Sequence, residues 1–192
     1  MNEIVIKENV LPLKLQKNIL AALTSKQFPW FFLNDITYSE LDNKDTHCNG
    51  YGFFHMVDHE GATSVWNEDL KKTLKPIHDL VNNAIPFFKK EFNFEYKKLS
   101  RIKIGLQTKI SEQSVSFTPH IDSPKPHFVI IYYVNSSDGD TVFYKTANKN
   151  TEIKRISPQM GSAVFFNGKN VHGGSSPALH SRRIVINFLF EI

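Results

Sequence analysis

The sequence has a single cysteine, Cys48, in 192 residues, and this scarcity excludes several kinds of protein. One thiol cannot form an internal disulfide, nor supply the several thiolates of a structural zinc site. Long apolar runs are also missing. The longest, Phe128–Val134, has seven residues, whereas a membrane-spanning helix needs about 20. Because the first residues also lack the basic flank and apolar stretch of a secretory signal, we expect a cytoplasmic protein without a membrane segment.

Arginine is scarce as well. The chain has 23 basic residues, of which only four are arginines, and the lysines are scattered. The net charge is +4 and the pI about 9.0. Proteins that bind nucleic acids usually gather arginine and lysine on one face. The pattern therefore favours a solvated, lysine-rich surface over a nucleic-acid-binding one.

What the chain does have is apolar and aromatic side chains. Hydrophobic residues make up 41% of the sequence and phenylalanine occupies 16 positions, enough for one packed core. The apolar spacing predicts amphipathic helices over Leu13–Thr24 and Asn67–Ile85, the second ended by Pro86. The aromatic runs Phe28–Leu33 and Tyr51–Val57 favour strands or buried loops. We therefore expect one domain, 1–192, in which residues 1–99 form a helical and aromatic supporting region.

From residue 100 onward, short β-type runs alternate with turn residues. Seven strands are expected: Arg101–Lys109, Val115–Asp122, Phe128–Asn135, Thr141–Lys145, Glu152–Ile156, Ser162–Phe166 and Arg182–Phe190. So many short strands in about 90 residues are typical of a sandwich or barrel. The fold class is therefore mainly β with N-terminal helices, an α+β arrangement whose residues 100–192 form the β core.

One constellation of residues suggests a metal site. His120 and Asp122 stand two residues apart, which on a strand directs both side chains to one face. His172 follows 50 residues after Asp122. Two histidines and one carboxylate on one side of a cation leave positions open, as in non-haem Fe(II) oxygenases. Taken alone, this spacing could also be a satisfied polar pair near a turn.

Arg183 strengthens the case, because it lies on a strand that should be buried. A buried guanidinium is costly unless an anion pairs with it. The planar fork of arginine suits a ligand carboxylate, although an internal acid could serve instead. If Arg182 faced inward in its place, Asn187 would be buried on the outer face as an unsatisfied amide, at a cost of about 1–3 kcal/mol. Arg183 is therefore the residue expected to face inward.

In these blocks the sequence resembles the Fe(II)- and 2-oxoglutarate-dependent dioxygenases, most nearly their prolyl 4-hydroxylase-like branch. The resemblance covers roughly residues 101–190. The matching blocks are His120-x-Asp122, Ile131-Tyr132-Tyr133-Val134-Asn135, Asp138-Gly139-Asp140-Thr141-Val142-Phe143, Gly161-x-x-Val164-Phe165-Phe166, His172 and Arg183-Ile184-Val185-Ile186-Asn187-Phe188.

The resemblance implies a double-stranded β-helix, a jelly-roll barrel of the cupin type, and a role for individual residues. His120, Asp122 and His172 would bind Fe(II), while Arg183 and Tyr133 would hold the distal carboxylate of 2-oxoglutarate. Tyr132 would point out of the barrel.

The sequence departs from the family pattern at two places. Family members often have a small or hydroxylated residue where this chain has Val185, and often Gly-Gly where it has Asp138-Gly139. Asn187, on the same predicted face as Arg183, is a candidate for the missing polar group.

The implied activity is oxidation by O2, with 2-oxoglutarate as co-substrate and ascorbate as a supporting reductant. A peptidyl or free prolyl-type substrate is the first hypothesis. Oxidation of a nucleobase or small metabolite is a second, and a non-catalytic jelly-roll binding module is a third. Specificity in such a barrel would come from loops, here 35–51, 58–66 and 112–118, none of which has a motif that names a ligand.

Overall fold

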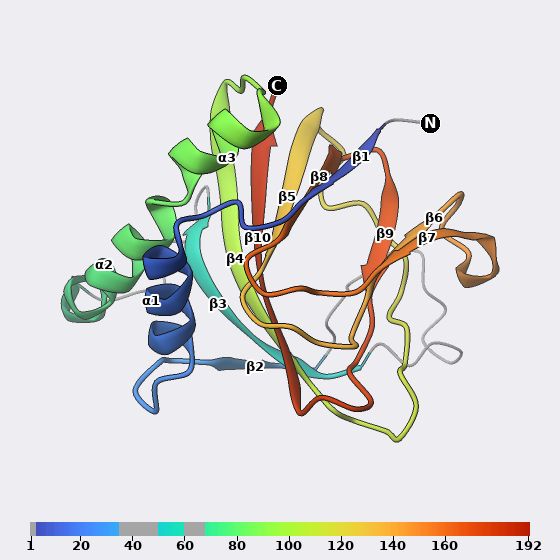
Figure 1. Ribbon diagram of the computed structural model, residues 1–192, viewed down its shortest axis with the longest axis horizontal. Helices are drawn as coiled ribbons and strands as arrows, with labels where there is room; N and C mark the ends of the chain where they lie inside the picture. The colour runs from blue at the N-terminus through green and yellow to red at the C-terminus, as the bar shows by residue number, and fades with distance from the viewer. Residues whose placement is uncertain (1–2, 35–49, 60–67) are drawn as a thin grey trace.

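The computed structural model describes residues 3–34, 50–59 and 68–192. Cys48, Asn67 and most of the loops 35–51 and 58–66 lie outside these ranges. The described residues form a layer of helices, a large antiparallel sheet and a smaller sheet that faces it (Figure 1). No helix of the described part is long and apolar enough to span a membrane.

Seven strands form the large sheet, in the order β1-β8-β5-β10-β4-β3-β2. Their bounds are β1 Ile4–Lys7, β2 Phe31–Leu33, β3 Gly52–His59, β4 Lys98–Thr108, β5 His127–Tyr133, β8 Ala163–Asn167 and β10 Arg182–Glu191. All neighbouring strands of this sheet are antiparallel. Because β1, β2 and β3 come from the first 99 residues, this part of the chain extends the sheet at both edges as well as covering it.

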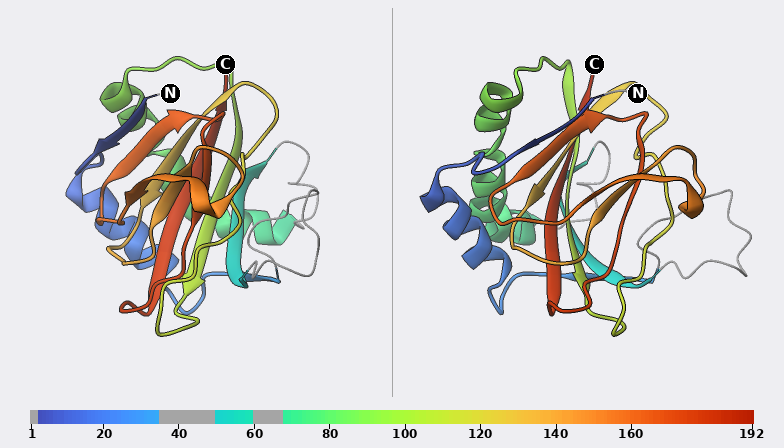
Figure 2. Two further views of the ribbon diagram at one scale, coloured as in Figure 1. Left: turned by 90° about the vertical axis from the view of Figure 1, so that its right-hand side faces the viewer. Right: turned by 45° about the vertical axis from the view of Figure 1, so that its right-hand side comes forward.

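The smaller sheet has three strands, in the order β7-β6-β9, with β6 at Thr141–Tyr144, β7 at Glu152–Ile156 and β9 at Val171–Gly174. A short 3-10 turn, η2, at Lys149–Thr151 leads into β7. The two turned views in Figure 2 show this sheet opposite the large one. Two facing antiparallel sheets confirm the expected jelly-roll fold.

Three helices cover the outer face of the large sheet: α1 Leu13–Leu23, α2 Glu68–Asn82 and α3 Ile85–Phe92. Strand β10 alternates between two apolar clusters. Ile184, Ile186, Phe188 and Phe190 pack with helix residues such as Ile19, Val81 and Phe88. The next residues along the strand, Val185 and Leu189, belong to a second cluster between the sheets. The expectation that another layer covers the Ile184–Phe190 face is thus confirmed.

Two local predictions were wrong, and proline explains both. Pro86 does not end the second helix, which stops at Asn82; it lies in the first turn of α3, where its missing N–H is no loss. Residues 115–122 do not form a strand: only isolated bridges occur, at Ser116 and His120. Pro119 lies between them and cannot donate a ladder hydrogen bond. The other six strands of the β half were predicted within a few residues of their bounds.

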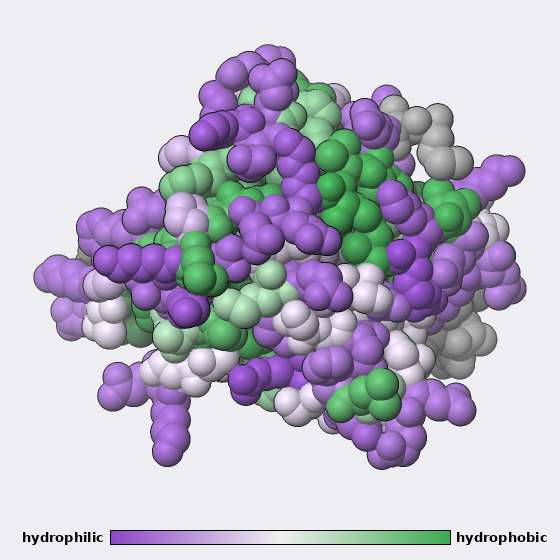
Figure 3. Space-filling view, viewed as in Figure 1, coloured by the Kyte–Doolittle hydropathy of each residue, from purple (hydrophilic) through white to green (hydrophobic). Residues whose placement is uncertain are grey.

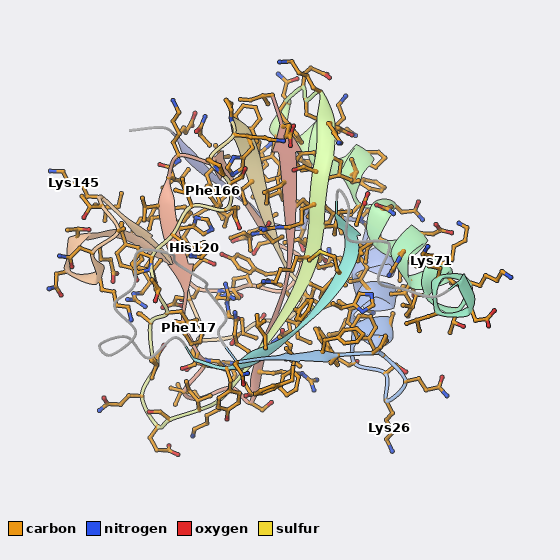
Figure 4. All side chains as sticks on the ribbon, turned by 180° about the vertical axis from the view of Figure 1, so that it is seen from behind. Lys26, Lys71, Phe117, His120, Lys145 and Phe166 are labelled. Carbon is orange, nitrogen blue, oxygen red and sulfur yellow. The ribbon has the colours of Figure 1, made fainter. Side chains whose placement is uncertain are left out.

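Hydrophilic side chains dominate the face seen in Figure 3, with hydrophobic residues gathered in patches between them. Three labelled lysines, Lys26, Lys71 and Lys145, point outward from different edges of the molecule in Figure 4. This dispersal agrees with the expectation of a solvated, lysine-rich surface.

Candidate active site

His120 and His172 lie opposite each other in an isolated antiparallel bridge between the 109–126 segment and β9. The N–H of each residue donates to the carbonyl of the other, at 2.8 and 2.9 Å. In Figure 4, His120 lies between the two sheets, near the interior. A backbone bridge, and not a regular strand, therefore brings these two side chains to the same place.

The side chains of His120, Asp122 and His172 converge, with one potential ligand atom of each within 4.8 Å of the others. His172 Nε2 lies 3.4 Å from Asp122 Oδ2, and both side chains are almost fully buried. Each imidazole directs Nδ1 at the carbonyl two residues before it: Thr118 O at 3.0 Å and Asn170 O at 3.2 Å. These bonds fix the tautomer that leaves Nε2 available to a metal. The donor set and its orientation fit Fe(II).

Electrostatics keep His120 and Asp122 in the protonation states that a divalent metal requires. Burial and, to a smaller extent, the neighbouring His172 lower the pKa of His120 to about 4, so its imidazole is neutral at pH 7. Burial opposes ionisation of Asp122. However, the neighbouring His172 and the charge of Arg101 outweigh it, and the pKa of this carboxyl lies well below its usual value. Neutral imidazoles and an ionised carboxylate are the metal-binding forms.

Arg101 is a site residue that the sequence did not reveal. From β4 its Nη2 donates to Asp122 Oδ1 at 2.5 Å, while Asn187 Nδ2 donates to Asp122 Oδ2 at 3.3 Å. The two donors hold one carboxylate from neighbouring strands. The signal that could have found it is the alternation along β4. Arg101, Lys103 and Gln107 lie at alternate positions and face inward, while Ile102 and Ile104 are buried at positions between them.

Asn187 was expected near Arg183, as a polar complement to the carboxylate pocket. In the structure, the Asn187 amide instead forms hydrogen bonds with Asp122 and Arg101. Asn187 lies four residues along β10 from Arg183. On a strand this is about 13 Å, which separates the two ends of the site.

Arg183 forms the other end of the site and is only 3% exposed. Its Nη1 donates to Gln107 Oε1 at 2.5 Å, and its Nη2 to Thr141 Oγ1 at 2.8 Å. The buried Nε has no hydrogen-bond partner among the described residues. Burial lowers the pKa of this guanidinium, against the opposing effect of Tyr133 and Asp140. Arg182, next to it, is exposed. The prediction that Arg183 and not Arg182 faces inward is therefore confirmed.

No carboxylate of the described residues pairs with Arg183. The nearby Asp140 instead bonds Arg155 Nη1 at 3.2 Å. Tyr133, inside the barrel, donates its hydroxyl to Thr141 Oγ1 at 2.8 Å, and burial raises its pKa to about 12. Tyr132 packs in the outer cluster, as expected. Thr141 thus accepts from both Arg183 and Tyr133, and its own proton is available to an anion beside them.

The Asp138-Gly139 departure from the family pattern has a structural reason. A Cβ at Gly139 would lie 2.7 Å from the carbonyl oxygen of Ser175 and 2.9 Å from Arg183 Cδ, so glycine is required beside the arginine. Asp138 needs no such space, since its carboxylate accepts from the backbone N–H groups of residues 178, 179 and 180.

One cavity of about 370 Å³ joins the two ends. Residues on its wall include Arg101, Asp122, His120 and His172 at the metal end, and Gln107, Thr141 and Arg183 at the other. A metal ion at the triad and a carboxylate at Arg183 would therefore share one cavity. The chain can hold a compact acid that reaches from the arginine to the metal.

Comparison with known proteins agrees with this chemistry. Residues 106–191 match the model of the 2OG-Fe(II) oxygenase superfamily. No protein with a curated description matches the sequence.

Solved structures show where the fold recurs. An oxidoreductase of the 2OG-Fe(II) oxygenase family from Burkholderia pseudomallei is 14% identical, with a TM-score of 0.64 over 98% of this chain and 84% of that one. A Pseudomonas putida prolyl-4-hydroxylase is 12% identical, with a TM-score of 0.58 over 100% and 93%. A Trichoplax adhaerens prolyl hydroxylase, in complex with a peptide fragment of hypoxia inducible factor, is 14% identical, with a TM-score of 0.56 over 100% and 84%.

At these identities the solved structures demonstrate a shared fold, the double-stranded β-helix, and the family match adds the chemistry. Fe(II), 2-oxoglutarate and O2 are what this family uses. Residues 106–191 thus match the 2OG-Fe(II) oxygenase superfamily, and the chain shares its fold with solved members of that superfamily; both findings support a 2-oxoglutarate-dependent dioxygenase.

Proposed function

We propose that the protein hydroxylates a C–H bond of a prolyl-type substrate, free or within a peptide. One oxygen atom of O2 enters the substrate as a hydroxyl group and the other enters succinate, while 2-oxoglutarate loses CO2. The observation that carries this proposal is the buried Arg183, which has no carboxylate partner among the described residues and shares one cavity with His120, Asp122 and His172.

Within this proposal each residue has a defined task. His120, Asp122 and His172 are the metal ligands, and Arg183, Thr141 and Tyr133 bind the distal carboxylate of 2-oxoglutarate. Bound Fe(II) supplies the redox chemistry with O2. Arg101 and Asn187 orient the Asp122 carboxylate, and Gln107 keeps the guanidinium of Arg183 in place. Ile131 and Val185 of the apolar cluster between the sheets also line the cavity.

Residues 100–192 provide this catalytic barrel, and we propose that the whole chain, 1–192, is a single domain. The N-terminal strands favour this proposal because β1 pairs with β8 and β3 pairs with β4. A prolyl-type substrate is favoured by the family blocks and by the fold shared with two prolyl hydroxylases.

Turnover tests the proposal. Purified protein is incubated with Fe(II), 2-oxoglutarate, ascorbate and a panel of prolyl peptides and free proline, and succinate and oxygenated products are measured by mass spectrometry. We expect wild-type protein and Asp69→Ala, a change at an exposed acid, to form succinate. Asp122→Ala should lose it, because a ligand of the metal is gone.

Equal succinate formation by wild type and Asp122→Ala would refute the metal assignment. Oxygenation of nucleobases or other metabolites in place of prolyl compounds would refute the substrate class. Absence of iron or manganese uptake, together with no stabilisation by 2-oxoglutarate, would indicate a non-catalytic binding module.

A further inference from the structure

The inward face of β4 presents a row of residues to the cavity. Arg101, Lys103, Gly105 and Gln107 all line it, at alternate positions of the strand. Arg101 donates a hydrogen bond to Asp122 at the metal end, and Gln107 accepts one from Arg183 at the other end. Lys103 lies between them, opposite Asn187 of β10, and serves neither end.

The Lys103 ammonium has an unusual environment for a lysine. Its only close interaction within the described parts of the chain is with the ring of Phe54, whose centroid is 5.8 Å from Nζ. No hydrogen bond or ion pair to an acid accompanies it there. Burial lowers its pKa and the charge of Arg101 lowers it further, against a weaker opposing effect of Asp122. An ammonium held in a cavity at this cost calls for an anion.

The charges around the cavity favour an anionic occupant as well. Among the described residues that line it, three cations, Arg101, Lys103 and Arg183, face one carboxylate, Asp122. Fe(II) and doubly ionised 2-oxoglutarate would cancel each other, so the loaded cavity would keep its excess of positive charge. Because Arg101 and Arg183 would already be engaged, Lys103 is the cation left for a second ligand.

We infer that Lys103 binds a carboxylate of the primary substrate and so sets the enzyme's preference for acidic compounds. This inference rests on the proposed function. One ammonium matches the single charge of a carboxylate, and the described residues of the lining offer no further unengaged cation for the second charge of a phosphate. Leu33, Phe53 and Phe54 line the same cavity and offer apolar surface to the carbon skeleton. The carboxylate is either the α-carboxylate of a free amino acid or the side chain of an acidic residue beside the target.

The experiment compares matched acids and amides. One arm uses free L-proline against L-prolinamide. The other uses acetylated, C-terminally amidated peptides in which Asp or Glu beside proline is exchanged for Asn or Gln, so that a side chain carries the only carboxylate. Each compound is assayed at several concentrations with Fe(II), 2-oxoglutarate and ascorbate, and oxygenated product is measured by mass spectrometry to give kcat/KM. The arm that shows a preference identifies the source of the carboxylate.

Three variants accompany wild type. Lys103→Met removes the charge and keeps a similar length, Lys103→Arg keeps the charge, and Lys97→Met removes an exposed lysine just before β4. We expect wild type and Lys97→Met to prefer the acid over its amide by about 10- to 100-fold, as for a hydrogen bond to a charged group. Lys103→Met should lose this preference because its kcat/KM falls for the acid but not for the amide. Lys103→Arg should keep most of the preference.

The outcomes separate this inference from the proposed function. Succinate formation by wild type without any acid–amide preference would overturn the role of Lys103 and leave the oxygenase proposal intact. A preference that persists in Lys103→Met would also overturn it. Failure of wild type to form succinate with any compound would instead overturn the proposed function, on which the inference rests.

Discussion

Two adjacent arginines on β10 have opposite surroundings. Arg183 is buried and Arg182 is exposed, because successive residues of a strand point to opposite sides of the sheet. Arg183 contacts Gln107 and Thr141, whereas Arg182 contributes only its backbone carbonyl to Asn135. The pair therefore offers two substitutions that are chemically identical and structurally opposed.

Arg183→Gln should raise the KM for 2-oxoglutarate by at least about 30-fold, since losing one member of a buried charge pair costs about 2–5 kcal/mol. Arg182→Gln should leave it nearly unchanged. Initial rates of succinate formation over a range of 2-oxoglutarate concentrations provide the measurement. Similar KM values for the two variants would contradict the assignment of Arg183.

Residue spacing together with the resemblance to a known family selected the candidate triad and Arg183, but not the residues that support them. Arg101 meets Asp122 across 21 positions of the sequence, and Gln107 meets Arg183 across 76. Such partners depend on how β4 lies beside β10. An isolated arginine or glutamine in a strand carries no mark of that pairing, so the sequence alone could not identify them.

At the scale of elements, a histidine pair joins β3 to α2. His55 Nε2 lies 2.9 Å from His78 Nε2, and His55 Nδ1 lies 3.0 Å from the carbonyl oxygen of Pro29. Burial lowers the pKa of His55 to about 4, and it lowers the pKa of His78 as well. Two imidazoles this close share one hydrogen bond only when at least one is neutral.

Acid should therefore weaken the fold over a defined range. In the unfolded chain His55 takes up a proton near pH 6.5, but in the folded protein only near pH 4. The unfolded state binds more protons between these values, so the free energy of unfolding should fall as the pH drops from about 6.5 to 4, by roughly 1 kcal/mol per pH unit at most. Urea unfolding at several pH values should show a flatter profile for His55→Gln. Parallel profiles for this variant and wild type would argue against the pair.

The errors among predicted elements have a common origin in short, local signals. A helical apolar pattern continues across residues 83–84, yet the helix breaks there and Pro86 starts α3. Strand β9 reads Val-His-Gly-Gly, whose glycines normally disfavour a strand, and it forms because β6 pairs with it. Strand β1 pairs with β8, more than 150 residues later. Long, strongly alternating strands such as β10 were predictable, because their pattern does not depend on a distant partner.

At the scale of the whole molecule, the cavity lies between two sheets that contribute different ligands. The large sheet provides Arg101, Gln107 and Arg183, while β6 and β9 provide Thr141 and His172. A metal and a co-substrate bound between them would contact both sheets at once. Binding should therefore stabilise the complete fold and not one layer.

Anaerobic thermal unfolding measures this coupling. Fe(II) and 2-oxoglutarate, each at about 100 times its dissociation constant, should each add about 2.7 kcal/mol, which is about 5–10 °C in Tm per ligand for a chain of this size. Asp122→Ala should lose most of this shift, and Arg182→Gln should keep it. An equal shift in Asp122→Ala would show that the ligands bind elsewhere.

Because of the reciprocal bridge between His120 and His172, the metal ligands come together whether or not a metal ion is bound. Its two amide hydrogen bonds are made by the backbone alone, so the ligands are gathered when the chain folds and do not wait for the ion. Little conformational freedom is left to lose when the metal arrives. Substitution of a coordinating side chain should then abolish binding while the polypeptide stays folded, which makes an inactive ligand variant informative about chemistry and not merely about misfolding.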